Sequence, residues 1–142
     1  MKIRPAVPGD LEAGLEMLRC AHGALQPATR WHAGAAASTL QRLMADPAGY
    51  AVVLQGASVV GISLGCVGPA LWQPGVQASN LLRWVAPAQR GAWHGPLLRH
   101  FEDWARAQGA SLIGVSQTGR IAARAYERQG YAPAEHMYFR NI

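Results

Sequence analysis

The chain has 142 residues, of which 50% are hydrophobic and 15% are charged. This length and composition fit one globular domain and exclude a disordered chain. The formal net charge is +5, and Lys2 is the only lysine. A positive excess favours an anionic partner, either a nucleic acid or a phosphorylated small molecule.

The ends and cysteines of the chain indicate its compartment. The N-terminal stretch "MKIRPAVPGD" has no apolar signal core, and no segment is apolar enough to span a bilayer. Cys20 and Cys66 show neither a CxxC motif nor metal-ligand spacing. We therefore expect a cytoplasmic protein with two reduced thiols, no metal and no membrane partner.

The first half of the chain predicts one strand, two helices and a hairpin. The expected elements are a strand at 1–6, a helix at about 10–23, a helix at 35–46, and hairpin strands at about 50–54 and 58–67. The turn "VPGD" places Asp10 as the N-cap of the first helix. A turn at Gln55-Gly56 joins the hairpin strands.

The second half alternates strands and helices. The expected elements are a strand at 78–85, a helix at about 95–108, a strand at 111–116, a helix at 119–130 and a last strand at 135–142. The order β-α-α-β-β-β-α-β-α-β predicts a mixed α/β sheet covered by helices. Without a linker or repeat, residues 1–142 form one domain.

The segment "VAPAQRGAWHGPLL" predicts an anion-binding loop between a strand and a helix. The first N–H groups of a helix have no intrahelical acceptor, and the helix dipole favours negative charge there. Gly91 and Gly95 let the backbone approach a ligand, and Arg90 adds a positive charge. The alternative is an ordinary strand-to-helix turn with two glycines, because short glycine motifs are common.

A second segment, "AARAYERQGYAP", places Tyr126 midway between Ala122 and the helix-ending Gly130. Four-residue spacing puts Ala122 and Tyr126 on one helix face. The Tyr126 hydroxyl either bonds to backbone in the core or points into a cleft between the two C-terminal strands.

These segments together resemble the Gcn5-related N-acetyltransferase (GNAT) family. The opening "IRPAVPGDLEAGLEML" is similar to the family's first strand and helix, "VAPAQRGAWHGPLL" to its acetyl-CoA loop, and "AARAYERQGYAP" to its C-terminal segment. The resemblance covers nearly the whole chain and is greatest to small stand-alone bacterial and phage members. It implies the GNAT fold, an α/β mixed sheet of about six to seven strands flanked by four helices.

The resemblance implies transfer of an acetyl group from acetyl-CoA to a primary amine, by direct attack in a ternary complex. The acceptor is a small molecule or a peptide. Val85 would meet the pantetheine arm through its backbone, and Tyr126 would protonate the leaving thiolate. The motif that would bind the CoA pyrophosphate, mainly through backbone N–H groups, comprises Arg90, Gly91, Ala92, Trp93, His94 and Gly95.

The chain departs from the family pattern at three places. Trp93 replaces a glycine of many members, and Gly119 stands where many have an asparagine that touches CoA. No Asp or Glu occurs between Asp46 and Glu102, so the strand that often carries the family's base has no carboxylate. Asn80 is the nearest polar candidate there, and it would act by orienting a water molecule.

Other residues have two readings each. The alternative proton acceptors are His22, His32, His94 and His100, whose side-chain type titrates near neutral pH. Nothing in the sequence places any of them in the cleft, and the other reading of each, which we prefer, is a surface or a hydrogen-bonded core residue. Trp31 and Trp72 lie in loops expected to flank the acceptor and are candidate substrate contacts. The arginines at 120, 124 and 128 form either a solvated stripe or a contact to the CoA 3′-phosphate.

Two other functions compete with the enzyme. One is a CoA-binding GNAT-fold protein without turnover, acting as a sensor or partner, which the missing carboxylate favours. The other is a basic nucleic-acid-binding module, but the arginines are dispersed and no binding motif occurs, so we expect no nucleic-acid partner. Family members often dimerise, which leaves a homodimer open.

Overall fold

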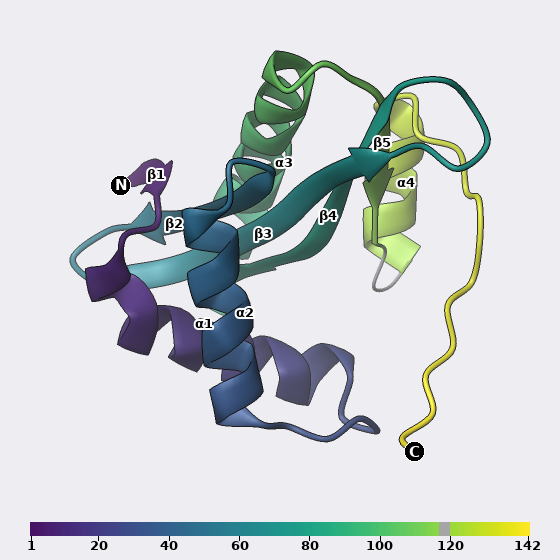
Figure 1. The fold of residues 1–142 in the computed structure, drawn as a ribbon. Helices are drawn as coiled ribbons and strands as arrows, with labels where there is room; N and C mark the ends of the chain where they lie inside the picture. The colour runs from purple at the N-terminus through teal and green to yellow at the C-terminus, as the bar shows by residue number, and fades with distance from the viewer. Residues whose placement is uncertain (117–119) are drawn as a thin grey trace.

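The structure of the protein is a computed structural model that describes residues 1–116 and 120–142, except for the side chains of residues 120–122. In chain order the described strands and α-helices are β1 (Lys2–Pro5), α1 (Leu11–Leu25), α2 (Ala33–Ala45), β2 (Gly49–Gln55), β3 (Val59–Pro69), β4 (Val76–Val85), α3 (Arg90–Ala107), β5 (Ala110–Val115) and α4 (Arg120–Arg128) (Figure 1). Short 3-10 turns, Pro8–Asp10 and Pro87–Gln89, precede α1 and α3.

The described strands form one sheet in the order β1-β2-β3-β4-β5. Strands β1 to β4 are antiparallel to one another, whereas β5 runs parallel to β4. Parallel neighbours require a crossover connection, which α3 supplies. The helices α1 and α2 cover one face of the sheet and α3 covers the other (Figure 1).

Each face of the sheet has its own apolar core. The core under α3 comprises Tyr50, Val52, Leu54, Ala78, Val85, Leu97, Phe101 and Ala105. The core under α1 and α2 comprises Ala21, Leu40, Leu43, Val53, Ile62, Leu64 and Trp84. Successive strand residues such as Val52 and Val53, or Trp84 and Val85, alternate between the two cores, as the pleat of a strand requires.

Glycine at position 65 lets α3 lie directly against β3. A Cβ added to Gly65 would lie 2.6 Å from Cε2 of Phe101 and 2.8 Å from the Ser79 carbonyl oxygen. Any larger residue would therefore push the helix away from the sheet. This close contact sets the distance between α3 and the sheet at Phe101.

Two expectations about the elements are wrong. Helix α3 begins at Arg90 and not near Gly95, because the 3-10 turn that starts at Pro87 continues directly into the α-helix. Pro96 removes only one helical hydrogen bond and does not stop it. No strand forms at 135–142, so the described residues give five strands where six to seven were expected. The final segment lies outside the sheet, along the right of Figure 1.

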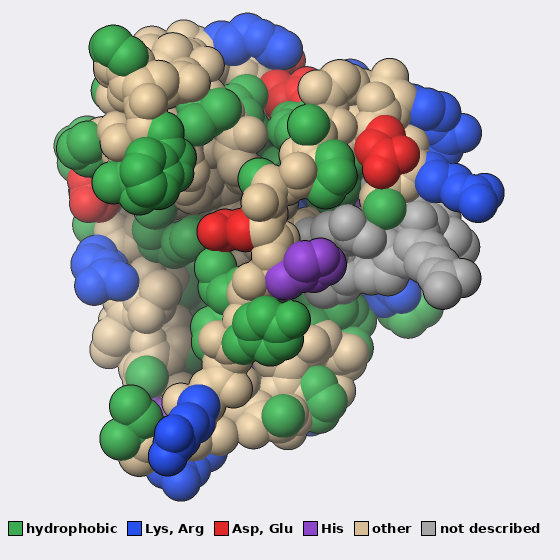
Figure 2. Space-filling view, turned by 90° about the vertical axis from the view of Figure 1, so that its right-hand side faces the viewer, with side chains coloured by type: hydrophobic (Ala, Val, Ile, Leu, Met, Phe, Trp, Pro, Cys, Tyr) green, Lys and Arg blue, Asp and Glu red, His purple; other side chains and the backbone are tan. Residues whose placement is uncertain are grey.

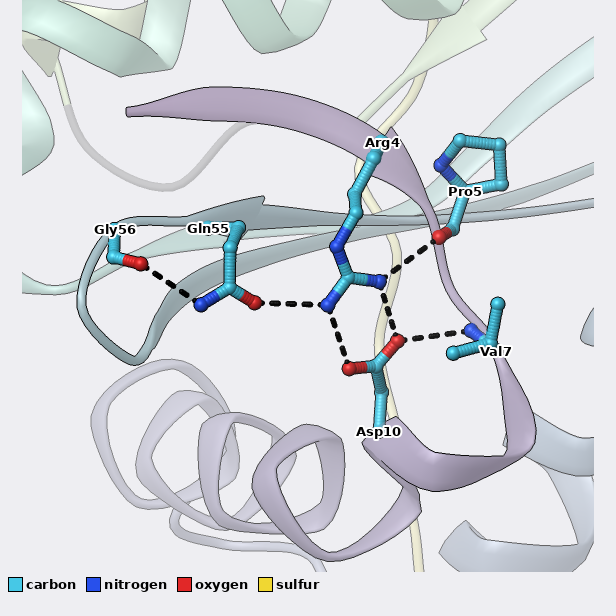
Figure 3. Close-up of polar contacts among 6 residues, drawn as sticks. All are labelled: Arg4, Pro5, Val7, Asp10, Gln55 and Gly56. Carbon is cyan, nitrogen blue, oxygen red and sulfur yellow. Dashed lines mark hydrogen bonds and ion pairs between the residues drawn. The ribbon is translucent and has the colours of Figure 1, made fainter.

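Asp10 occupies the N-cap position of α1, as expected, but its side chain does not bond to the N–H groups of the helix. The carboxylate instead joins β1 to the start of α1 and, through Arg4, to β2 (Figure 3). Its carboxylate accepts hydrogen bonds from Nη1 and Nη2 of Arg4, at 2.7 and 2.8 Å, and from the Val7 N–H at 2.8 Å. Arg4 Nη2 also donates to Oε1 of Gln55 on β2, at 2.8 Å. Arg4 first, and the Val7 N–H in addition, hold the pKa of the Asp10 carboxyl below its usual value.

We expect Asp10→Asn to lower the free energy of unfolding by about 1.5–3 kcal/mol at neutral pH, the range for hydrogen bonds to charged groups. Because the pKa of Asp10 is lowered by folding, its stabilisation is complete above the unfolded-state pKa of about 3.9 and is lost as the pH falls through the folded-state value. Urea denaturation of both proteins across this pH range should show the difference shrinking in acid. Glu16→Gln, at the exposed Glu16–Arg19 pair, is the matched control and should cost much less, because solvent screens an exposed ion pair. A pH-independent Asp10→Asn effect would contradict the assignment.

Candidate active site

Within the described residues, strand β4 extends beyond its parallel partner and leaves an open backbone edge. Its pairing with β5 ends at Asn80 and Val115, whereas its pairing with β3 continues to Val85. The Ala86 N–H bonds to the Val60 carbonyl on the β3 side, at 2.8 Å. Since backbone groups of successive strand residues point to alternate sides, those of Arg83 and Val85 point to the side that β5 leaves open.

A β-bulge starts this opening. Leu64 pairs with Leu82 and Gly65 with Asn80, so Leu81 is an extra residue in β4. The Asn80 amide is buried and donates to the Leu64 carbonyl at 3.0 Å, to Ser63 Oγ at 3.1 Å and to the Leu82 carbonyl at 3.4 Å. These contacts make Asn80 a positioning residue for the bulge. The water-orienting role that we expected for it stays a prediction.

The segment 90–95 forms the first turns of α3, where we expected a loop. The N–H groups of Gly91 and Ala92 have no acceptor within the helix at this position. A Cβ added to Gly91 would meet nothing within 4 Å, and one added to Gly95 would meet only Nη1 of Arg99, at 3.5 Å. Neither glycine has a positive φ. The fold therefore requires glycine at neither position, which is the pattern expected where a ligand approaches the backbone.

Arg90 and Val85 are in direct contact. Nε of Arg90 donates to the Val85 carbonyl at 3.2 Å, and its guanidinium lies 4.6 Å from the ring centre of Trp84. Arg90 thus fixes the turn between β4 and α3 and places a positive charge beside the helix N-terminus. The Val85 side chain is buried under α3, so only its backbone is available to a ligand.

Trp93 packs with its indole against the core under α3. Its side chain therefore takes part in the packing of the helix on the sheet. A bulky residue at this motif position is compatible with the fold for that reason.

A buried arginine joins two of the expected site residues. Arg83, only 8% exposed, donates from Nε to Nε2 of His94 at 3.3 Å and from Nη2 to the Tyr126 hydroxyl. The Tyr126 hydroxyl in turn donates to the Ser116 carbonyl at 3.0 Å, at the end of β5. Tyr126 and His94 were candidates from the sequence, whereas Arg83 was missed, although it is the one charged residue in the apolar stretch "ASNLLRWV".

Arg83 also carries a free donor. Among the described residues, its Nη1 is the buried side-chain nitrogen or oxygen that has no hydrogen-bond partner. An unpaired buried donor on a cation is costly. A buried polar group without a partner calls for an explanation, and an oxygen atom of a bound ligand is one.

His94 is a weak base in this setting. Burial, with the positive charges of Arg83 and Arg90 in addition, lowers the pKa of His94 to about 4. It is therefore neutral at physiological pH and can accept the Arg83 hydrogen bond. His100, another expected proton acceptor, contacts the Tyr50 hydroxyl through Nδ1 at 2.9 Å.

A pocket of about 380 Å³ lies between the two N-terminal helices and the bulge of β4. Its apolar lining includes Leu18, Leu25, Leu64, Leu81, Leu82 and Trp31. Its polar lining includes Arg30, His22 and His32, and no carboxylate of the described residues lines it. Since Leu81 and Leu82 also belong to β4, the pocket adjoins the open edge. The sequence predicted Trp31 as a substrate contact, and its place in the pocket lining is compatible with that prediction. His22 and His32 were two of four histidines that the sequence offered as proton acceptors.

The remaining expected residues lie apart from this region or cannot be placed. Trp72 is 90% exposed in the β3–β4 loop and does not line the pocket. Arg124 and Arg128 are exposed on α4. Gly119 lies outside the described residues, and so does the Arg120 side chain.

Comparisons with known proteins identify the fold. No family model matches the chain, and no curated protein matches it. A transcriptional regulator from Bacillus halodurans C-125 has a similar structure, with 23% identity, 99% of each chain covered and a TM-score of 0.80. So do an aminoglycoside 6′-N-acetyltransferase from Acinetobacter haemolyticus (15% identity, 100% of this chain and 98% of that one, TM-score 0.77) and an acetyltransferase from Trypanosoma brucei (17%, 99% of each, 0.75).

These neighbours, most of them acetyltransferases, show that the chain has the GNAT fold. Across the described residues, no three His, Cys, Asp or Glu side chains are grouped as a metal site would need. None of the helices within the same residues is long and apolar enough to cross a membrane.

Proposed function

We propose that the protein is an acetyl-CoA-dependent N-acetyltransferase whose active site lies at the open edge of β4. The observation that carries this proposal is the convergence of three features at that edge. They are the backbone of Arg83 and Val85 on the side of β4 that faces away from β3, the N-terminus of α3, and the Arg83–Tyr126 pair.

The residues present suit acetyl-CoA as a substrate. The free Nη1 of Arg83 and the positive N-terminus of α3 both favour anionic or carbonyl oxygens. The open glycines at 91 and 95 leave room beside the helix for a diphosphate. The backbone N–H of Val85, on the open side, is a donor for the thioester carbonyl, where charge develops during transfer.

The reaction needs one proton donor and one proton acceptor. The acceptor amine attacks the acetyl carbonyl carbon, so that a C–N bond forms, the C–S bond breaks, and the thiolate takes a proton. Tyr126 is the donor, since its hydroxyl lies at the same edge and is held by Arg83. It must turn from the Ser116 carbonyl toward the sulfur to deliver that proton.

The proton acceptor comes from the pocket histidines, because no carboxylate lines the pocket. His22 Nε2 lies 3.0 Å from the Thr29 carbonyl oxygen, which requires a proton on that nitrogen. Its Nδ1 is then the basic nitrogen. His32 instead uses Nδ1 to accept the Ala35 N–H, at 3.1 Å.

The pocket chemistry also restricts the acceptor. The lining of the pocket is mostly apolar, and among the described residues the charged side chain in it is that of Arg30. A polycation such as an aminoglycoside or polyamine would meet a like charge and no carboxylate. We therefore propose an amine with an apolar body and no second positive charge, for which Trp31 supplies an aromatic wall.

The test is release of CoA thiol from acetyl-CoA with a panel of amines. Phenethylamine, isoamylamine, phenylalanine, spermidine and kanamycin cover the relevant charges and shapes. We expect turnover with the apolar monoamines and little with spermidine or kanamycin. Turnover confined to the polycations would contradict the acceptor class while leaving acetyl transfer intact.

We expect Gly95→Val to weaken CoA binding by at least about 1 kcal/mol, roughly fivefold, the scale of disturbed charge-assisted hydrogen bonds. The apo-protein should keep its stability, because a Cβ here meets no close neighbour and valine is no worse than glycine in a helix. Calorimetric titration with CoA measures the change. Gly23→Val on α1, also in open space, is the matched control and should leave affinity unchanged. Equal CoA affinity in Gly95→Val and the wild type would show that the N-terminus of α3 does not bind CoA.

A second function, CoA binding without turnover, has support from the same residues. The pocket has no carboxylate base, and Trp93 stands where many enzymes of this fold have glycine. Such a protein would bind acetyl-CoA in the calorimeter and release no thiol with any amine. The two functions therefore separate in one pair of experiments.

A further inference from the structure

Arg83 is a buried cation that no acid of the described residues neutralises. It is 8% exposed, and the ion pairs found within these residues involve other arginines, namely Arg4, Arg19 and Arg106. Figure 2 shows that the Lys and Arg side chains on the face toward α4 stand out at the outline of the molecule, where water solvates them. A charge inside the protein lacks this solvation and is costly unless an opposite charge pairs with it.

The groups around the Arg83 guanidinium are neutral or positive. Its partners among the described residues are the imidazole of His94 and the hydroxyl of Tyr126. Burial first, and then the charges of Arg83 and Arg90, lower the pKa of His94 to about 4, so this imidazole carries no charge at physiological pH. The remaining donor, Nη1, is covered by protein atoms and has no partner among the described residues. The guanidinium therefore offers a charge and a donor that match a carboxylate oxygen.

This guanidinium lies beside the expected position of the acyl group of the donor. In the proposed site the thioester carbonyl meets the Val85 N–H, and the sulfur meets the Tyr126 hydroxyl. Arg83 faces the α3 side of the sheet, as Val85 does, because alternate residues of a strand share a face. It also lies one hydrogen bond away from Tyr126. The CoA pyrophosphate is expected elsewhere, at the N-terminus of α3 beside Arg90.

We propose that the protein also uses acyl-CoA donors whose acyl group ends in a carboxylate, and that Nη1 of Arg83 binds this carboxylate. The inference rests on the proposed acyl-transfer function and adds a second class of donor to it. An acetyl group ends in a methyl group and leaves Nη1 unsatisfied. A succinyl group places a carboxylate two methylene groups beyond the thioester carbonyl and supplies the missing anionic oxygen.

The bonds that change are the same for both classes of donor. The amine nitrogen attacks the thioester carbon, so that a C–N bond forms and the C–S bond breaks. The Tyr126 oxygen accepts from Nη2 of Arg83, while its proton turns from the Ser116 carbonyl to the departing thiolate. The amine proton goes to a pocket histidine, and exchange with solvent restores both groups. The acyl carboxylate keeps its charge and changes no bond.

An amide carbonyl of the pantetheine arm is the competing partner for Nη1. This carbonyl is present in every CoA species, whereas the carboxylate is present only in some donors. The two assignments therefore differ in what Arg83→Met does. Loss of a carboxylate contact removes a preference between donors, and loss of a pantetheine contact weakens all donors by the same factor.

Calorimetric titration with succinyl-CoA and butyryl-CoA measures this preference, because butyryl has a methyl group in place of the carboxylate. We expect the wild type to bind succinyl-CoA at least about tenfold more tightly, the scale of one hydrogen bond between charged groups. Arg83→Met should bind both donors about equally, and Arg83→Lys, which keeps the charge, should keep part of the preference. Arg90→Met, which removes the neighbouring charge, is the matched control and should weaken both donors but keep the preference.

The comparison of donors in the wild type needs no variant, and equal affinity for both would overturn the proposal. A preference that persists in Arg83→Met would overturn the assignment to Arg83. CoA itself, titrated in parallel, separates this inference from the proposed function. CoA binding without a preference for succinyl-CoA overturns the inference alone, whereas no binding of any CoA species overturns both.

Mass spectrometry with phenethylamine as the acceptor tests transfer. We expect N-succinylphenethylamine from succinyl-CoA in excess of the amount formed without protein. Arg83→Met should lower succinyl transfer by at least about tenfold more than butyryl transfer, in proportion to the lost contact. Tight binding of succinyl-CoA without product, while butyryl-CoA is used, would show that the carboxylate holds the donor away from the acceptor and would overturn its role as a donor.

Discussion

Tyr126→Phe is expected to lower turnover by about 10²–10⁴-fold, the usual effect of losing a general acid or base. Binding of CoA should change little, since the ring that packs beside Arg83 and Tyr131 is retained. The measurement is steady-state thiol release with an apolar amine, together with calorimetric titration of CoA.

The Tyr126 variant also loses structure-stabilising contacts, which must be separated from catalysis. Its hydroxyl bonds to Arg83 and to the Ser116 carbonyl, so we expect a loss of about 1–3 kcal/mol in stability. Assays well below the melting temperature remove this contribution. Tyr131→Phe, which loses a similar bond to Glu102, is the control and should keep its turnover. Near-normal turnover in Tyr126→Phe would mean that this residue only packs.

Arg83→Met is expected to weaken CoA binding by about 10–150-fold, corresponding to about 1.5–3 kcal/mol for a hydrogen bond to a charged group. Turnover should fall as well, because Tyr126 loses the guanidinium that positions its hydroxyl. Stability should stay level or rise, since replacing a buried charge by an apolar side chain of similar size often has that effect.

The diagnostic feature of Arg83→Met is weaker CoA binding without a loss of stability. Arg83→Lys keeps the charge but lacks the fork that reaches both His94 and Tyr126, so it should restore binding more than turnover. Arg42→Met, on the exposed surface of α2, is the matched control and should change neither. If Arg83→Met destabilised the protein and left CoA affinity intact, Arg83 would be a structural residue alone.

The sequence predicted the elements up to α4 because their signals are local. Apolar periodicity gave the helices and strands, and the Gln55-Gly56 turn gave the hairpin. The predicted start of α3, near Gly95, was too late in the chain, because no local sequence signal shows that the turn at Pro87 continues as a helix. The prediction of a last strand at 135–142 was wrong for a different reason. A strand forms only where a neighbouring strand pairs with it, and the pattern of residues 135–142 alone does not show whether such a neighbour exists.

The candidate site could be predicted only where a short motif carries it. The glycine pattern before α3 and the position of Tyr126 are of this kind. Arg83 was missed because its importance depends on contacts with His94 and Tyr126, which are distant in sequence. The role of the Asn80 amide depends on a bulge at Leu81, which period-two alternation does not reveal.

The most direct test of the central claim is mass spectrometry of phenethylamine incubated with acetyl-CoA and the protein, in parallel with Tyr126→Phe. The account predicts N-acetylphenethylamine from the wild type and at least about a hundredfold less from the variant, in line with loss of the general acid. Equal product from both proteins would contradict the site. No product with this or any other amine of the panel, despite measurable CoA binding, would contradict catalysis and leave a CoA-binding protein.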